Sequence, residues 1–168
     1  MIVYDNFLEK SLFFNLKKNI SNECFPWFFC SSITGNEIEQ NGYFSHVLYL
    51  YNEKPSIFFS LIEPVYEIIQ QKFKTKTLLR AKANLYPRND SLVHHKKHTD
   101  YPFVNLAIIL YINSNDGYTV IGDNKVKSIE NRLLVFDGSF PHNSTNCTDS
   151  QNRININFNF LEYNESSN

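Results

Sequence analysis

Residues 153–163, RININFNFLEY, alternate between apolar and polar side chains with a period of two. Successive side chains of a β-strand point to opposite faces, so the pattern predicts a strand with one apolar and one polar face. The apolar face carries Ile154, Ile156, Phe158 and Phe160, and the polar face carries Arg153, Asn155, Asn157 and Asn159. If Arg153 points into the interior, Asn155 and Asn157 must point there as well, because residues two apart on a strand share a face. Otherwise the asparagines form a face exposed to solvent.

Five further segments in the second half of the chain predict strands joined by tight turns. Asn115–Gly117 and Asp123–Asn124 have the composition of turns. Residues 103–112 are mainly apolar and rich in β-branched side chains, which is typical of a strand covered on both faces. The predicted strands are RAKANLYP (80–87), FVNLAIILYI (103–112), YTVIG (118–122), KVKSIE (125–130) and LLVFD (133–137).

Two helices are predicted in the first half of the chain. From about Asn6 to Ile20, apolar residues recur near helical spacing with lysines between them. The second helix is predicted from a capping box, in which Ser60 and Glu63 satisfy N–H groups at the helix start, with Pro64 in the first turn. Its apolar stripe continues through Ile68, Ile69 and Phe73.

The order of these elements predicts a mainly β fold with N-terminal helices. Residues 24–58, between the helices, contain short aromatic-rich pieces that we expect to form edge strands and loops. Short strands after a pair of helices favour a β-sandwich or jelly roll whose helices brace one sheet. A chain of 168 residues favours a single domain. We place that domain at residues 1–164, with helical support over roughly 1–75 and a jelly-roll core over roughly 78–162.

Charge and cysteine content narrow the class of protein. With 16 Lys+Arg and 17 Asp+Glu, the net charge of −1 offers no general footprint for nucleic acid, which is disfavoured as a partner. No basic region precedes an apolar run at the N-terminus, and no stretch has the length of a membrane span, so we expect neither a signal peptide nor a membrane partner. Three scattered cysteines favour reduced thiols in the cytoplasm, which for a viral protein would be that of the host.

The stretch HHKKHTDYP (94–102) carries the candidate chemistry. In an extended chain His98 and Asp100 project to the same side, where they offer two facial ligands for a divalent metal. His142, in a loop after an apolar strand, is the candidate third ligand. Two histidines and a carboxylate with open positions opposite suit non-haem Fe(II) oxygen chemistry. Arg153, eleven residues after His142, has a planar fork that suits a carboxylate.

The other histidines are expected to be structural. His94 and His95, with the lysines at 96 and 97, predict a solvated loop rather than metal ligands. His46 lies among aromatic residues, and we expect a partly buried histidine whose ring nitrogens are satisfied.

The run His-x-Asp…His…Arg resembles the signature of the Fe(II)/2-oxoglutarate-dependent dioxygenases, as it occurs in small prolyl-4-hydroxylase-like members. The stretch ANLYPRNDSLVHHKKHTDYP (83–102) is similar to the segment entering the metal site in that group. PWFF (26–29) and FSHVLY (44–49) are similar to small viral and bacterial members. The loop departs from the family pattern, because HHKK replaces a glycine-containing run. The resemblance implies a double-stranded β-helix, or jelly roll.

By this resemblance, His98, Asp100 and His142 would ligate Fe(II), and Arg153 would pair with the distal carboxylate of 2-oxoglutarate. Tyr86 matches a tyrosine that often donates a second hydrogen bond to the cosubstrate. Asn155 matches a residue that reaches the cosubstrate in nucleic-acid demethylases of the superfamily, and Asn84 is a weaker candidate for the same contact.

The function that the resemblance implies is hydroxylation of an unactivated C–H, with release of succinate and CO2. Its cosubstrates would be 2-oxoglutarate and O2, with ascorbate as the reductant. The substrate would be a peptidyl proline, another protein side chain or a small molecule, and the sequence leaves both it and the oligomeric state open. Asp100 favours hydroxylation over halogenation, since halogenating relatives have a small residue at this position. The alternatives are a nucleic-acid demethylase and a non-catalytic metal-binding jelly-roll module.

Overall fold

The computed structural model describes residues 1–32 and 42–161, which form mostly antiparallel β-structure with two α-helices. The predicted strand end at residues 162 and 163, and part of the aromatic-rich segment 24–58, lie outside the described residues. The elements are β1 (Ile2–Tyr4), α1 (Lys10–Ile20), β2 (Phe28–Cys30), β3 (Tyr43–Leu50), the 3-10 helix η1 (Ile57–Leu61), α2 (Glu63–Phe73), β4 (Thr77–Pro87), β5 (Asn105–Tyr111), β6 (Tyr118–Ile121), β7 (Asn124–Lys127), β8 (Leu133–Asp137), β9 (His142–Ser144) and β10 (Asn152–Leu161).

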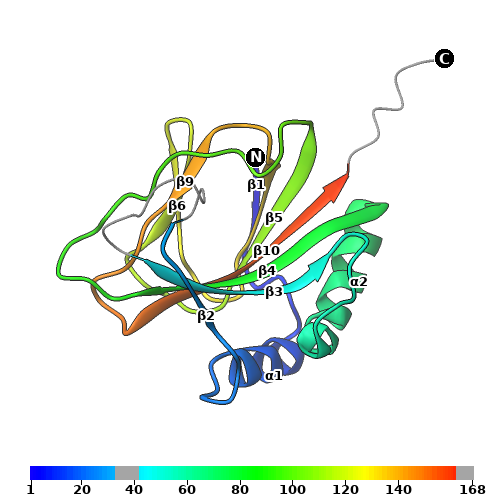
Figure 1. The fold of residues 1–168 in the computed structure, drawn as a ribbon, viewed down its shortest axis with the longest axis horizontal. Coiled ribbons are helices and arrows are strands. Elements are labelled where there is room, and N and C mark those ends of the chain that lie inside the picture. The colour runs from blue at the N-terminus through cyan, green and yellow to red at the C-terminus, as the bar shows by residue number, and fades with distance from the viewer. Residues whose placement is uncertain (33–41, 162–168) are drawn as a thin grey trace.

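Two antiparallel sheets form the body of the described chain. The larger has seven strands in the order β1-β8-β5-β10-β4-β3-β2, and the smaller has three in the order β7-β6-β9. Both helices lie on one side of the large sheet, and β6 and β9 lie on the other side (Figure 1). The strands β4 and β5 follow one another in the chain but do not pair, because β10 lies between them and pairs with both. These connections and layers are those of a jelly roll with helices bracing one sheet.

The alternating strand β10 separates the two interiors of the protein. Its apolar residues pack into the cluster that includes residues of α1 and α2, where the Phe160 ring stacks on Tyr66 with centroids 6.1 Å apart. Its polar residues point to the opposite face and are also buried, at 0–8% exposure: Arg153, Asn155, Asn157 and Asn159. The solvent-face alternative for the asparagines is therefore wrong, because the second sheet and its loops cover that face.

The N-terminal segment differs from its predicted helix. The helix α1 begins at Lys10 rather than near Asn6, with Glu9 as its N-cap. Ahead of it, β1 pairs with β8, and Asn6 has a left-handed φ of 51° that breaks any helix there. Asn131 then fixes the segment: the backbone N–H of Leu8 donates to its Oδ1 at 2.9 Å, and its Nδ2 donates to the Leu8 carbonyl at 2.8 Å. Of the two apolar residues between Asn6 and Lys10, Leu8 is buried and Phe7 is partly buried against the core.

The predicted capping box is wrong. Ser60 belongs to η1, and its hydroxyl donates to the carbonyl of Ile57 at 3.2 Å. The N-cap of α2 is Ile62, which makes no side-chain cap bond, whereas Ser56 caps η1 by accepting from the backbone N–H of Phe58. Pro64 does lie in the first turn of α2, where its missing N–H is tolerated.

The strand predictions of the second half are confirmed within a few residues. The strand LLVFD coincides with β8, and β5 is buried on both faces as its apolar run predicts. The strand predicted at 125–130 ends at Lys127. The next residue, Ser128, donates its backbone N–H to the carbonyl of Gly117, and the chain then turns at Asn131, whose φ is 57°. In the aromatic-rich segment β2 is an edge strand as predicted, but β3 is an inner strand that lies between β2 and β4.

No helix of the described ranges has the length and apolarity to span a membrane.

We expect Phe158→Ala to lower the free energy of unfolding by about 3 to 5 kcal/mol, because Phe158 is fully buried in the core between sheet and helices. Urea denaturation measures the change. The matched control is Phe14→Ala on α1, whose side chain is 65% exposed and which should cost less than about 1 kcal/mol. Equal losses in the two variants would contradict this account of the core.

Candidate active site

The three predicted metal ligands converge on one point. The loop after β4 pairs with the start of β9, so that His98 and His142 exchange backbone hydrogen bonds of 2.9 Å in both directions. The backbone N–H of Asp100 donates to the carbonyl of Gly138 at 3.0 Å, which continues the same contact. One ligand atom from each of His98, Asp100 and His142 lies within 4.8 Å of the others. The structure therefore brings together residues that are far apart in sequence.

Both imidazoles present the same nitrogen to this point. The Nδ1 of His142 lies 2.9 Å from the carbonyl of Phe140, and the Nδ1 of His98 lies 3.3 Å from that of Lys96. A carbonyl only accepts, so each Nδ1 carries the proton and each Nε2 keeps a free lone pair for a metal. The Nε2 of His142 is 3.8 Å from Oδ2 of Asp100. Burial, and then the neighbouring His142, lower the pKa of His98, which favours the neutral ligand form.

Asp100 is held as an anion by residues of β4 and β10. Nη2 of Arg80 donates to its Oδ1 at 2.6 Å, and Nδ2 of Asn159 donates to its Oδ2 at 2.9 Å. Burial by itself raises the pKa of Asp100, but the Arg80 guanidinium, with His142 and Asn159, outweighs burial and leaves the pKa below its usual value. The ionised carboxylate is the form that binds a metal. Two imidazoles and an ionised carboxylate are a donor set that fits a divalent ion such as Fe(II).

Arg153 is fully buried on the inner face of β10 and has only neutral partners. Its guanidinium donates to the hydroxyls of Ser128 at 2.6 Å, Ser144 at 2.5 Å and Thr119 at 3.0 Å, and to the carbonyl of Thr145 at 3.2 Å. No carboxylate in residues 1–32 and 42–161 pairs with it. A buried cation without an anion is costly, so this side of the site favours a negatively charged ligand.

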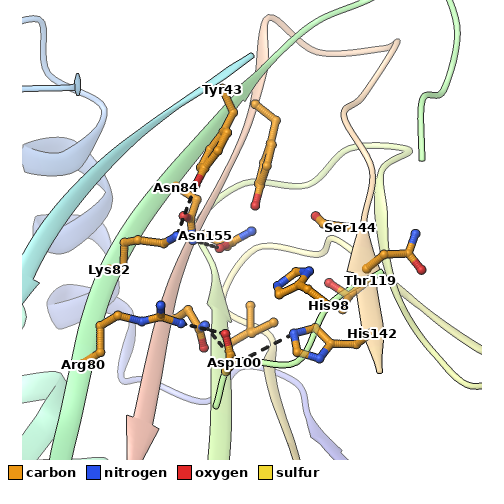
Figure 2. A pocket seen from close by; sticks show the side chains of 14 residues that line it. Tyr43, Arg80, Lys82, Asn84, His98, Asp100, Thr119, His142, Ser144 and Asn155 are labelled. Atoms are coloured by element: carbon orange, nitrogen blue, oxygen red, sulfur yellow. Dashed lines mark hydrogen bonds and ion pairs between the residues drawn. The ribbon is translucent and has the colours of Figure 1, made fainter. Parts of the chain in front are cut away.

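One pocket extends from the triad of His98, Asp100 and His142 to the hydroxyl groups that accept from Arg153 (Figure 2). Thr119 and Ser144, which accept from Arg153, line its wall. The predicted cosubstrate residues Tyr86, Asn84 and Asn155 line it as well, with Nδ2 of Asn84 donating to Oδ1 of Asn155 at 3.0 Å. The Arg153 guanidinium lies over the Tyr86 ring, 5.3 Å from its centroid. All seven predicted site residues therefore line this pocket or contact residues that do.

The sequence patterns did not reveal the whole site. Arg80 and Lys82 on β4 and Tyr43 on β3 also line the pocket. Arg80 and Lys82 have the same parity along β4 as Asn84 and Tyr86, so an alternation count from Tyr86 would have placed them on the same face. Tyr43 had no such signal, because its position depends on the pairing of β3 with β4.

The solvated-loop prediction is wrong for His95 and correct for its neighbours. His94 and the lysines at 96 and 97 are exposed, but His95 is only 6% exposed and stacks on the Tyr86 ring at 4.8 Å. Its backbone N–H donates to the carbonyl of Ser144, so the loop is fastened to the strand beside it. His46 behaves as predicted: it is buried, and its ring nitrogens lie 2.9 Å from the carbonyl of Pro26 and the hydroxyl of Ser56.

Burial, and then the positive charge of Arg153, lower the pKa of His95 to about 4. The unfolded chain therefore binds a proton at His95 below about pH 6.5, where the folded chain does not. Stability from the neutral ring is present above this pH and is lost as the pH falls toward 4. We expect His95→Gln to reduce the loss of unfolding free energy between pH 7 and pH 5 by on the order of 2 kcal/mol.

Urea denaturation at the two pH values measures this difference. The control is His94→Gln, which replaces an exposed neighbour and should leave the pH dependence of stability as in the wild type. An unchanged pH dependence in His95→Gln would show that another group titrates.

Comparisons with known proteins bear on the fold. No protein-family model and no curated protein matches the sequence. Among solved structures, the chain is similar to a prolyl-4-hydroxylase from Pseudomonas putida, with 13% identity, a TM-score of 0.62 and coverage of 96% of this chain and 92% of that one. It is also similar to a prolyl hydroxylase from Trichoplax adhaerens in complex with a hypoxia inducible factor peptide fragment, with 13% identity, a TM-score of 0.69 and coverage of 95% and 82%.

A third similar structure is the non-heme alpha ketoglutarate dependent epimerase SnoN from nogalamycin biosynthesis, with 11% identity, a TM-score of 0.62 and coverage of 96% and 77%. These proteins share a fold but are named for different reactions. At such identities the likeness establishes the architecture alone, because one fold supports many different reactions. The chain therefore has the fold of these solved structures, which are two prolyl hydroxylases and one non-heme alpha ketoglutarate dependent epimerase.

Proposed function

We propose that this protein is an Fe(II)- and 2-oxoglutarate-dependent dioxygenase that hydroxylates an unactivated C–H. The observation that carries the proposal is one pocket with a metal-binding triad, beside a buried arginine that lacks an anionic partner among the described residues. A module that only bound a metal would have no need of such an arginine near the ion.

His98, Asp100 and His142 would hold Fe(II) through two Nε2 atoms and a carboxylate oxygen. When bound, Fe(II) with 2-oxoglutarate and O2 supplies the oxidising chemistry, which releases succinate and CO2. The chain itself prepares the ligands: backbone carbonyls fix the tautomers of both histidines, while Arg80 and Asn159 keep Asp100 ionised and oriented. Arg80 and Asn159 are therefore positioning residues.

The distal carboxylate of 2-oxoglutarate would pair with Arg153. The hydroxyls of Thr119 and Ser144 now occupy its guanidinium donors at the pocket wall, and a carboxylate there would supply the missing negative charge. Tyr86 and Asn155 stand on the same wall and would contact the cosubstrate by hydrogen bonds, while Nδ2 of Asn84 donates to Asn155 and orients it. The surrounding strands bury this wall, so the ion pair would form with little competition from water.

The substrate is a peptidyl proline, another protein side chain or a small molecule. The Trichoplax neighbour in complex with a peptide supports a peptide substrate, and the epimerase from a biosynthetic route supports a small molecule. Ascorbate is the proposed reductant that keeps the metal in its ferrous state.

We expect His98→Ala to lower succinate formation from 2-oxoglutarate at least about 100-fold and to weaken Mn(II) binding, because one of three protein ligands is lost. Succinate is measured with Fe(II) and ascorbate present, and Mn(II) binding by calorimetry without 2-oxoglutarate. The control is His94→Ala, which removes an exposed histidine four residues away. Wild-type protein that forms no succinate, or His98→Ala that keeps wild-type rates, would refute the oxygenase.

We expect Arg153→Met to weaken 2-oxoglutarate binding about 10- to 100-fold, since a buried charge-assisted hydrogen bond contributes roughly 1.5 to 3 kcal/mol. Arg153→Lys keeps the charge without the planar fork and should fall between Met and the wild type. The Kd is measured on Mn(II)-loaded protein, with circular dichroism as the check of folding. Folded Arg153→Met with the wild-type Kd would place the distal carboxylate elsewhere.

A further inference from the structure

Lys82 presents a second positive charge to the pocket. It lies on β4 between Arg80 and Asn84 in the alternation, and its side chain points toward the space between β4 and the triad (Figure 2). Its ammonium donates to the hydroxyl of Tyr43 at 3.3 Å and lies 5.4 Å from the centre of the Tyr43 ring. No carboxylate of the described residues forms an ion pair with Lys82.

Lys82 is the one pocket cation of the described residues that has neither a carboxylate partner nor a proposed one. Arg80 is matched by Asp100, and Arg153 would be matched by the distal carboxylate of 2-oxoglutarate. The other carboxylate of the cosubstrate would be engaged at the metal. Burial, and then the neighbouring Arg80, lower the pKa of Lys82 to about 8, as expected for an ammonium that is short of negative charge. A further anion would stabilise this wall.

Two hydrogen-bond acceptors on the same wall also lack partners. The Oδ1 atoms of Asn84 and Asn157 are buried and accept no hydrogen bond from residues 1–32 or 42–161. Asn157 lies directly opposite Lys82 in the pairing of β10 with β4, and its Nδ2 is turned toward Asp100. The Nδ2 of Asn84 is turned toward Asn155. Ionised 2-oxoglutarate has no N–H or O–H to donate, so it cannot satisfy these two oxygens.

We propose that Lys82, Asn84 and Asn157 form a substrate subsite for a free amino acid, with the carboxylate on Lys82 and the ammonium on the two amide oxygens. An amino acid offers an anion and hydrogen-bond donors a few atoms apart, which matches the one cation and two acceptors left over on the wall. A proline inside a peptide chain offers neither a carboxylate nor an N–H. The inference rests on the proposed oxygenase function and chooses among its substrate classes.

The test uses Fe(II)-loaded enzyme with 2-oxoglutarate and three series of probes. The probes are the twenty free L-amino acids, their carboxamides and their N-acetyl carboxamides. The rate of succinate formation is compared with the rate without a probe, and products are examined by mass for the added oxygen. We expect at least one free amino acid to stimulate succinate formation and to be hydroxylated, with its carboxamide at least ten-fold less effective at equal concentration.

The lysine itself is tested by matched variants. Lys82→Met should bring the free acid down to the level of its carboxamide, and Lys82→Arg should restore at least part of the difference. The control is Lys72→Met on α2, where the same substitution removes a lysine that packs over the Tyr4 ring and not at the pocket. The comparison of acid with carboxamide on wild-type enzyme changes only the ligand, so it stands even if a variant fails to fold.

Two results would overturn the subsite: capped or carboxamide probes that stimulate as well as the free acid, or no stimulation by any free acid. If succinate still forms without a probe and depends on His98, the oxygenase proposal survives and only the subsite inference falls. If no His98-dependent succinate forms under any condition, the proposed function falls and the subsite inference falls with it.

Discussion

The reciprocal backbone pair between His98 and His142 is the contact on which the site depends. It is an isolated bridge between the loop after β4 and the first residue of β9, and it sets both imidazoles side by side, with ring centroids 4.6 Å apart. Since main-chain atoms make this pair, the side chains remain free to bind a ligand. Neighbouring carbonyls orient the rings, and Arg80 orients the acidic member from the opposite wall. The triad is thus held from both sides while its ligand atoms stay available.

The two faces of the large sheet bury different kinds of side chain, so that apolar packing on one face offsets the free-energy cost of burying polar groups on the other. Its outer face packs isoleucines and phenylalanines of β10 into the core with the helices, while its inner face buries an arginine and three asparagines. Most of these polar groups bond to one another or to the hydroxyls of Thr119 and Ser144. Among the described residues, Oδ1 of Asn157 on this strand and Oδ1 of Asn84 on β4 stay unsatisfied, and both residues line the pocket. Stability and chemistry are therefore divided between opposite faces of one strand.

Local patterns in the sequence predicted the features that periodicity determines. The alternation of 153–163 identified β10 and placed Arg153 with the asparagines, and spacing placed His98 beside Asp100. The parts that could not be predicted depend on partners distant in sequence. Asn131 fixes Leu8 ahead of the first helix, which therefore begins later than predicted, and the carbonyl of Ser144 holds the buried His95 through its backbone N–H. Arg80 and Lys82 share the parity of Tyr86, but only the register against β10 shows which groups they face.

The central position of β10 has a consequence for the order of assembly. It is the last of the described strands in chain order, yet it lies between β4 and β5 in the middle of the large sheet. Such pairings between distant segments form late in folding, because long loops must close first. A chain still emerging from the ribosome would contain His98, Asp100 and His142 before it contained β10, which carries Arg153. The pocket that we propose as an oxygenase site would thus be completed only after synthesis has passed β10.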